Sequence, residues 1–304
     1  MKKQEPRISF YNQISTNKWK SFFLILIVFM VFIVLGAVIG LALGPDYFTL
    51  IMIAAIIISI IYVWVGYYYS ADIALASVNA KPADRRLHKG FYDSVEGLTL
   101  ASGMPMPKLY VMDSSEINAF ASGRDPKNAV ICVTSGALER LDKQELEGVL
   151  GHELSHVANY DIRFMTLVAV LVGMIAIVSE IFLRSLWFSS GNRDDDSKGN
   201  AIFMVIGIIL AILAPIVVQL VQLAVSRKRE YMADASAVKF IRSPTGLIGA
   251  LKKIEKEHVP DQEKQKINKA VAPLFISDPF KRKIQGLFST HPPIEKRIEI
   301  LERM

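Results

Sequence analysis

Two histidines and a glutamate lie within five residues of the chain, in the run His152-Glu153-Leu154-Ser155-His156. On an α-helix, His152 and His156 are one turn apart, so both imidazoles can bind one zinc ion. Glu153 then lies beside the water molecule that fills the open coordination position, where a carboxylate acts as a general base. The chain has only five histidines among 304 residues, so a chance match to H-E-x-x-H is rare. The motif predicts a metallopeptidase centre.

The residues around this motif have the pattern of an amphipathic helix. Asp142 followed by Glu145 is typical of a helix start. Apolar residues then recur at three- and four-residue steps, which is the helical period, at Leu146, Val149, Leu150 and Val157. The pattern therefore places both histidines on one helix face.

A catalytic zinc ion needs a third protein ligand, and Glu230 is the candidate. Glu230 and Asp234 form E-x-x-x-D, the arrangement of gluzincins, which are H-E-x-x-H peptidases with a glutamate ligand on a downstream helix. Two apolar runs separate His156 from Glu230, and a hairpin of two membrane spans would return the chain to the same side. The alternative for Glu230 is a surface ion pair with neighbouring Arg and Lys.

Two carboxylates are candidates to accept the remaining N–H groups of the ligating imidazoles. Asp234 follows Glu230 by one helical turn, and Asp161 follows His156 closely. The alternatives are a helix cap for Asp161 and a solvated carboxylate for Asp234.

The composition predicts a membrane protein. Hydrophobic residues make up 52% of the chain, the mean hydropathy is +0.33, and the excess is concentrated in long runs. Residues 21–43 and 48–69 are uncharged and longer than the roughly 20 residues that cross a bilayer. Residues 164–183 and 201–225 carry Glu180 as their only charge, and buried helices of a soluble core are their alternative. The first run follows a basic segment, as in a signal peptide, but its length and the second span right after it favour a retained anchor.

The basic residues predict the orientation of the spans. They gather before the first span, after the second and after the fourth, which makes this side cytoplasmic. The net charge of +6 is explained by this rim, and no nucleic-acid-binding motif accompanies it. Cys132, the only cysteine, lies in a strand-like apolar run and is expected in the core.

These patterns give a mainly α fold class: a multi-span helical membrane protein with a zincin-like α+β cytoplasmic metallopeptidase domain. Strands are expected around residues 108–112 and 129–134, a helix around Leu87, Phe91, Val95 and Leu98, and exposed charged segments at 252–257 and 260–269. Residues 261–283 are interpreted as a mobile loop over the cleft. The predicted segments are a basic cytoplasmic arm (1–20), membrane helices (21–43 and 48–69), the first peptidase part (70–163), membrane helices joined by an external loop (164–183, 184–200 and 201–225) and the second peptidase part (226–304).

The chain resembles the HtpX family of bacterial integral-membrane zinc endopeptidases, which are related to the CAAX prenyl proteases. The resemblance covers nearly the whole chain. It rests on the order of the spans and of five motifs: residues 118–121, 151–156 with Asp161, 227–234, 289–293, and Arg297 with Leu301. It implies one Zn²⁺ per chain, bound by His152, His156 and Glu230, with Glu153 as the base. It also suggests that Asn118, Ala119, Phe120 and Ala121 form an edge strand that pairs with an extended substrate, and that His291 stabilises the oxyanion. The alternatives are an ordinary strand end and a helix entry residue, respectively.

The predicted function is zinc-dependent hydrolysis of membrane proteins at the cytoplasmic face of the bacterial cell membrane, with both termini cytoplasmic. The resemblance adds a role in quality control of misfolded or damaged membrane proteins. The expected partners are protein or peptide substrates and the lipid bilayer, without nucleic acid. A prenyl-protein endoprotease is the close alternative. A noncatalytic metal-binding scaffold or receptor is the alternative of another class, although such a protein has no use for Glu153.

Overall fold

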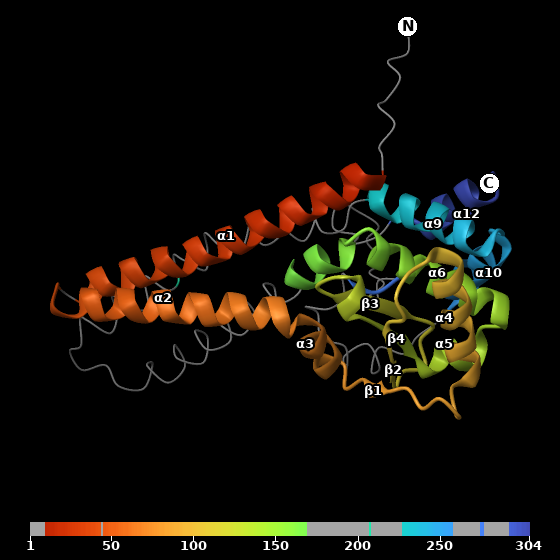
Figure 1. Cartoon of the computed structure of the whole chain (residues 1–304), viewed down its shortest axis with the longest axis horizontal. Coiled ribbons are helices and arrows are strands. Elements are labelled where there is room, and N and C mark those ends of the chain that lie inside the picture. Colours follow the sequence, from red (N-terminus) through yellow and green to blue (C-terminus); the bar gives the residue numbers. More distant parts are fainter. Residues whose placement is uncertain (1–9, 44, 169–206, 208–226, 258–273, 277–291) are drawn as a thin grey trace, which may run out of the picture.

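The computed structural model describes residues 10–43, 45–168, 207, 227–257, 274–276 and 292–304. Two long helices project from a globular part, which contains a small sheet with helices packed on it (Figure 1). The first long helix begins beside this globular part, runs away from it, and the second returns to it. The fold thus joins an apolar hairpin to a mixed α and β unit.

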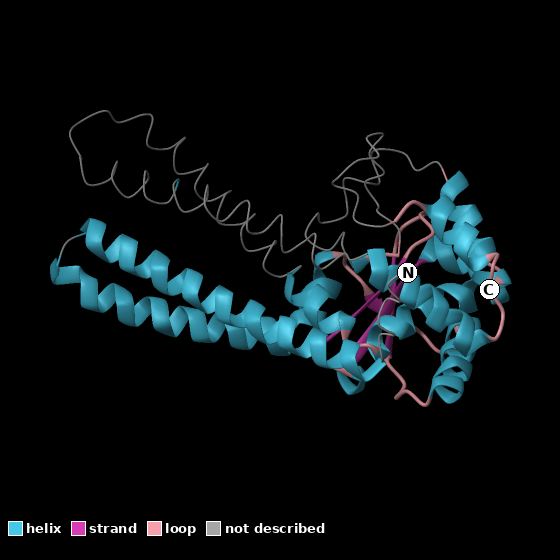
Figure 2. Cartoon of the chain, turned by 90° about the horizontal axis from the view of Figure 1, so that it is seen from above, coloured by secondary structure: helices cyan, strands magenta, loops and turns pink. Residues whose placement is uncertain are grey.

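The hairpin consists of α1 (Phe10–Leu43) and α2 (Pro45–Tyr68), which lie side by side in both views (Figures 1 and 2). Both are long and apolar enough to cross a membrane. A side chain at Gly36 would place its Cβ 2.4 Å from the Cβ of Ala55, so glycine permits this close approach. Large apolar side chains point outward along both helices, as a lipid-facing surface requires. This arrangement agrees with the first two predicted spans.

The boundaries of both helices differ from the prediction. The first helix begins at Phe10 rather than at residue 21, and its candidate span is Ile14–Val34. Asn17 and Ser21 are buried against the globular part, so helical structure continues through the basic segment. The second helix begins at Pro45 rather than at residue 48, because proline is compatible with the first turn of a helix.

Four strands form the sheet, in the order β1-β2-β4-β3. Strands β2 (Lys108–Met112) and β4 (Ala129–Thr134) lie where the sequence predicted them, and the structure pairs them in parallel. Strands β1 (Lys81–Pro82) and β3 (Ala119–Gly123) are antiparallel edges. Short helical segments join these elements at Ser70–Ser77 (α3), Pro126–Asn128 (η1) and Ser135–Arg140 (α5). The edge strand β3 contacts the helix that carries the histidine motif.

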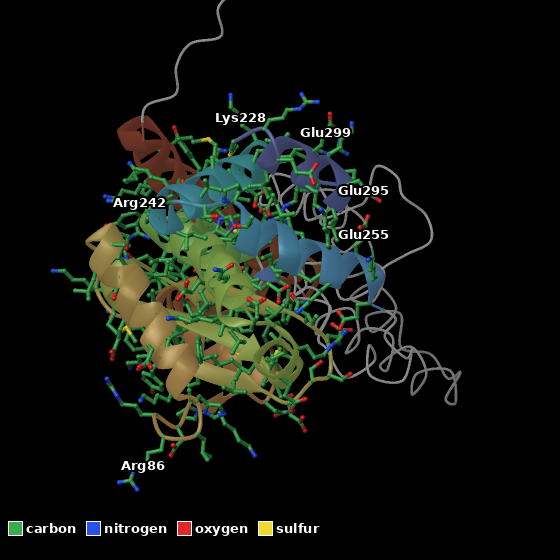
Figure 3. All side chains as sticks on the ribbon, turned by 90° about the vertical axis from the view of Figure 1, so that its right-hand side faces the viewer. Arg86, Lys228, Arg242, Glu255, Glu295 and Glu299 are labelled. Atoms are coloured by element: carbon green, nitrogen blue, oxygen red, sulfur yellow. The ribbon has the colours of Figure 1, made fainter. Side chains whose placement is uncertain are left out.

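The other helices of the globular part include α4 (Lys89–Ser102), α6 (Lys143–Ala158), α9 (Arg227–Ile241), α10 (Thr245–Lys256) and α12 (Ile294–Leu301). Helix α6 is central and packs against α4, α9, α10 and β3. One continuous apolar core joins these helices to one face of the sheet. Charged side chains such as Arg86, Arg242 and Glu255 point outward around this core (Figure 3).

Two predicted details of these helices are wrong. Leu87 precedes α4 and is 83% exposed, because Asp84 accepts hydrogen bonds from the backbone N–H groups of Arg86 and Leu87 and forms a turn there. The expected exposed stretch at 252–257 contains the buried Ile254 and the buried carboxylate of Glu257, which accepts from the Ile117 N–H and pairs with Arg140. The prediction from charge content did not consider that this stretch alternates between a buried face and an exposed face.

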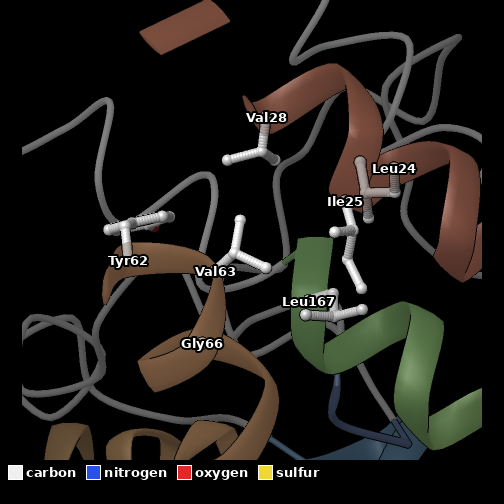
Figure 4. A pocket seen from close by; sticks show the side chains of 7 residues that line it. All are labelled: Leu24, Ile25, Val28, Tyr62, Val63, Gly66 and Leu167. Carbon is white, nitrogen blue, oxygen red and sulfur yellow. The ribbon is translucent and has the colours of Figure 1, made fainter. Parts of the chain in front are cut away.

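The hairpin and the globular part meet at an apolar joint. Leu24, Val28, Phe164, Leu167 and Val168 form a small core there, between α1 and the helical residues 161–168. A small apolar pocket opens beside it, lined by Ile25 and Tyr62 among others (Figure 4). The joint fixes the start of α1 against the segment that follows α6. The third and fourth predicted spans and the external loop lie outside the described residues, apart from residues 164–168 and 207.

Candidate metal centre and active site

Helix α6 carries the H-E-x-x-H motif and has a strong start. Asp142 caps the backbone N–H of Glu145, and the Glu145 carboxylate accepts from the Asp142 N–H in return. The predicted helix start is therefore confirmed. From Gly148 to Ala158 every residue of α6 is buried, so its histidines lie inside the protein.

Two glycines on α6 allow other helices to approach the motif. A Cβ at Gly148 would lie 2.4 Å from the backbone nitrogen of Leu247 in α10. A Cβ at Gly151 would lie 3.4 Å from the Cβ of Ala237 in α9. This close packing brings Glu230, near the start of α9, beside the two histidines.

The side chains of His152, His156 and Glu230 converge in a buried group, with potential ligand atoms within 4.8 Å of one another. The two Nε2 atoms are 3.3 Å apart, and the Glu230 carboxylate oxygens lie 3.5 Å from Nε2 of His152 and 3.7 Å from Nε2 of His156. Donors bonded to one tetrahedral zinc ion at about 2.0 to 2.1 Å are themselves separated by about 3.3 Å. The spacing of these three side chains therefore fits a single zinc ion.

His152 is oriented by a buried ion pair. Its Nδ1 lies 2.9 Å from Oδ1 of Asp234, and Arg297 on α12 donates to both Asp234 oxygens at 2.6 and 2.9 Å. Burial and Arg297 oppose protonation of His152, but the hydrogen bonds with Asp234 and Glu230 outweigh them and raise its pKa to about 9. Although burial acts in the other direction, Arg297 and His152 hold the pKa of Asp234 below its ordinary value. These contacts direct Nε2 of His152 toward Glu230.

His156 is oriented by a different set of contacts. Its Nδ1 lies 3.1 Å from Oδ2 of Asp161, which is fully buried. Asn17 on α1 donates to the other Asp161 oxygen at 2.6 Å, and Arg229 on α9 lies 3.8 Å from it. Burial lowers the pKa of Arg229, against the opposing effects of Asp161 and Glu230. Nε2 of His156 therefore also faces Glu230.

The charges around this group favour a cation. Four buried carboxylates (Glu153, Asp161, Glu230 and Asp234) face two buried guanidinium groups (Arg229 and Arg297). With both imidazoles neutral, as zinc ligands must be, these carboxylates outnumber the guanidinium groups, and this excess of negative charge favours a divalent cation.

Glu153 is buried beside the two histidines. Burial raises the pKa of its carboxyl, while His152, His156 and the backbone N–H of Ala121 act to lower it. Its Oε1 is buried, and no described residue hydrogen-bonds to it. A carboxylate oxygen with an open hydrogen-bonding position can accept a proton from a water molecule at this site.

The edge strand β3 borders Glu153 and is already paired at one end. The Ile276 N–H donates to the Ala119 carbonyl at 3.0 Å, and Phe275 forms a bridge with Phe120. The side chain of Asn118, just before the strand, accepts from the Ala119 N–H at 3.1 Å. Residues 274–276, the described part of the expected loop, are therefore buried against β3. Ala121 is the strand residue whose backbone N–H interacts with the Glu153 carboxylate.

Sequence reasoning found the motif side chains but missed three that support them. Arg297 was noted only as part of a motif, although it is a charged residue on the apolar face formed by Ile294, Ile298 and Leu301. Nothing in the local pattern distinguished Arg229 from other basic residues or Asn17 from other polar ones. His291 lies outside the described residues.

Comparisons with known proteins found one matching family model and several similar proteins. The model of the family described as "Peptidase family M48" matches residues 86–304. A protein described as "Protease HtpX homolog" from Caldanaerobacter subterraneus subsp. tengcongensis is 45% identical over 248 residues, which is 81% of this chain and 82% of that protein. Proteins with the same description from Dictyoglomus turgidum and Streptococcus uberis are 42% and 37% identical, each over 97% of this chain and over 95% and 99% of their own length.

Among solved structures, the crystal structure of Ste24p from S. mikatae matches 95% of this chain. Its sequence identity is 21%, the TM-score is 0.47, and the match spans 66% of that chain.

Proposed function

The chain belongs to peptidase family M48 and is a membrane metalloprotease, and we propose that it is a zinc-dependent endopeptidase that hydrolyses membrane proteins at the cytoplasmic face. The observation that carries this proposal is the buried group of His152, His156 and Glu230 beside Glu153. Three protein ligands with a carboxylate next to them are the arrangement of a catalytic zinc site, since structural sites normally have four protein ligands.

The proposed zinc ligands are His152, His156 and Glu230, one ion per chain. When bound, zinc supplies a Lewis acid that polarises the scissile carbonyl and lowers the pKa of a coordinated water to about 7. Asp234 and Asp161 accept the Nδ1 protons of the two imidazoles and so keep each Nε2 available as a ligand.

Glu153 is the proposed general base. It accepts a proton from the attacking water, whose oxygen bonds to the carbonyl carbon, and it passes this proton to the nitrogen of the leaving amine as the C–N bond breaks. Its raised pKa makes the carboxylate a stronger base than an exposed glutamate. We also retain His291 as the proposed stabiliser of the oxyanion.

The proposed substrate site is the edge of β3. An extended peptide pairs there through main-chain hydrogen bonds. The Ala119 carbonyl already accepts from the Ile276 N–H, and the Ala119 N–H already donates to the Asn118 side chain. We therefore propose that the substrate lies along β3 from Ala121 onward, beside Glu153. Pairing of a substrate with the first residues of β3, Ala119 and Phe120, requires displacement of residues 274–276.

We propose four membrane spans, with both termini and the peptidase part on the cytoplasmic side, because the basic residues cluster at the same ends of the spans. This places the buried site next to the start of α1, where substrates leaving the membrane come within reach. We also propose a role in quality control of misfolded or damaged membrane proteins, which rests on the similarity to the proteins described as "Protease HtpX homolog".

The decisive experiment measures cleavage of an unfolded membrane protein by the detergent-solubilised chain, together with its zinc content. Glu153→Gln keeps the shape of the side chain but removes the base, so we expect it to retain zinc and to lose activity by about 10²- to 10⁴-fold. The matched control is Glu147→Gln on the same helix, a half-buried carboxylate that pairs with Lys143 and should leave activity unchanged.

Each other outcome changes the proposal. Equal cleavage by both variants would show that the site is wrong or that a contaminant cuts the substrate. Bound zinc without cleavage by the unmodified chain would favour a metal-binding scaffold. Cleavage of a prenylated peptide but not of its unmodified form would favour a prenyl-protein endoprotease.

A further inference from the structure

We propose that Asn17, on the first membrane helix, is a positioning residue for the metal centre, which it reaches through Asp161 and His156. This inference rests on the zinc function proposed above and extends it. It makes α1 part of the metal site rather than only an anchor.

The first observation is the burial of one amide on an otherwise exposed turn. Asn17 is 2% exposed, whereas the neighbouring Trp19 is 57% exposed and Lys18 is also exposed. A buried amide in a helix costs free energy unless its hydrogen bonds are made. The position of Asn17 is therefore determined by its partners.

Both partners belong to the short segment after α6. The two N–H groups of the Asn17 amide donate to the Asn159 carbonyl at 2.9 Å and to Oδ1 of Asp161 at 2.6 Å. The other Asp161 oxygen lies 3.1 Å from Nδ1 of His156. A continuous series of contacts thus leads from α1 to a proposed zinc ligand.

The second observation is the backbone between these two partners. Tyr160 has a φ of +59°, a left-handed conformation that bulky residues rarely adopt. This turn points the chain back so that Asp161 can reach His156, which lies on the preceding helix. Asn17 bonds to the residue on each side of Tyr160, and Lys18 lies over the Tyr160 ring, 4.6 Å from its centroid. The start of α1 therefore holds the unfavourable turn in place.

The third observation is that α1 cannot shift freely. Leu24 and Val28 of α1 pack against Phe164 and Leu167, directly after the turn, so the helix and the turn form one packed unit (Figure 4). Arg229 also faces Asp161, at 3.8 Å, and its guanidinium lies over the Phe164 ring. Arg229 therefore places a positive charge near Asp161, and Asn17 donates the short hydrogen bond to its carboxylate.

The test measures zinc affinity by competition with a chelator, and kcat and KM for a peptide substrate. Contacts that orient ligating residues typically contribute 10- to 100-fold to metal affinity. Because Asn17 acts one hydrogen bond further out, we expect Asn17→Ala to weaken zinc binding by about 10-fold, at the lower end of that range. The kcat should fall, and KM should change little.

Two controls separate positioning from general loosening of α1. Leu24→Ala removes packing at the same joint without touching Asp161, and Ser15→Ala changes an exposed residue on the same helix. Ser15→Ala should retain the zinc affinity of the unmodified chain, and Leu24→Ala should weaken zinc binding clearly less than Asn17→Ala does. If Leu24→Ala weakens zinc binding as much as Asn17→Ala does, the role of Asn17 is packing and the inference is wrong.

Exchanging the Asn17 amide and the Asp161 carboxylate tests the hydrogen bond between them by rescue. Asn17→Asp places a carboxylate against Asp161 and loses the hydrogen bond, whereas in Asp161→Asn the one remaining acceptor oxygen faces either Asn17 or His156 but not both. The double variant restores a donor and an acceptor with exchanged positions, and we expect its zinc affinity to exceed that of Asn17→Asp by several-fold. Additive losses would overturn the proposal.

Failure of this inference can be distinguished from failure of the proposed function. If the unmodified chain binds no zinc, the zinc function fails. If the unmodified chain binds zinc and Asn17→Ala binds it equally well, the zinc function stands and only the role of Asn17 is wrong.

Discussion

The two halves of the metal centre are built from the same residue types but supported in different ways. On one side, Asp234 orients His152 and is itself held by two hydrogen bonds from Arg297. On the other, Asp161 orients His156 and is held by the Asn17 amide, with Arg229 further away. The first half is formed within the helices of the globular part, and the second depends on α1, a candidate membrane helix.

Because of this difference, the half of the metal centre around His156 should be the more sensitive to changes in α1. A buried carboxylate paired with a guanidinium carries its own charge compensation. A carboxylate held by a neutral amide depends on the position of that amide, and here the amide belongs to α1. Changes to the hairpin should therefore reach His156 before they reach His152.

The largest effect is expected from removal of the ligands themselves. His152→Ala and His156→Ala should each lose the bound zinc and reduce peptide hydrolysis to background, because two protein ligands hold the ion too weakly. Zinc content per chain and cleavage of an unfolded substrate check this prediction. Full zinc content in either variant would mean that the ligand set is wrong and that the two halves are not equivalent in function.

The next effect concerns the two arginines. Arg297→Leu leaves Asp234 as an uncompensated buried charge, which should lower the free energy of unfolding by about 3 to 5 kcal/mol. Arg229→Leu should cost less, because Asn17 still donates to Asp161. Denaturant unfolding in detergent, followed by circular dichroism, measures both. The control Arg303→Gln removes only an exposed pair on α12, worth about 0.3 to 0.5 kcal/mol. A larger loss for Arg229→Leu would reverse the comparison.

The two carboxylates should differ in their effect on metal affinity. Asp234→Asn and Asp161→Asn should each weaken zinc binding by about 10- to 100-fold. We expect the greater loss for Asp234→Asn, because Arg297 lies 2.6 Å from Asp234, whereas Arg229 lies 3.8 Å from Asp161. Chelator competition gives the affinities, with the exposed Asp93→Asn as the unchanged control. Equal losses would show that the support of each carboxylate has little influence on the metal.

The smallest effect is expected from the start of α6, which serves both halves. Asp142→Ala removes the helix cap and should cost about 1 kcal/mol of stability. The zinc affinity should not change, because the cap lies more than two turns before His152 in the helix. Thermal unfolding and chelator competition, made side by side, test this separation. A loss of zinc affinity would contradict it.

Several local features could be predicted from the sequence because their causes are local. Helix α6 follows from its cap and its apolar period, and β2 and β4 follow from their apolar runs. The two hairpin helices follow from length and hydrophobicity. The helix start at Phe10 and the exposure of Leu87 could not be predicted, because they depend on contacts between distant segments or on a side-chain turn.

The chemistry of the site can be read from the chain alone: an H-E-x-x-H helix, a downstream glutamate, and two carboxylates at suitable spacing. How these groups are held depends on the folded arrangement. Arg297 meets Asp234 and Asn17 meets Asp161 across long intervals of chain, where no short-range pattern records the pairing. The physical reason is that a buried polar group is placed by the partners that satisfy it, and those partners are brought together by packing of the whole fold.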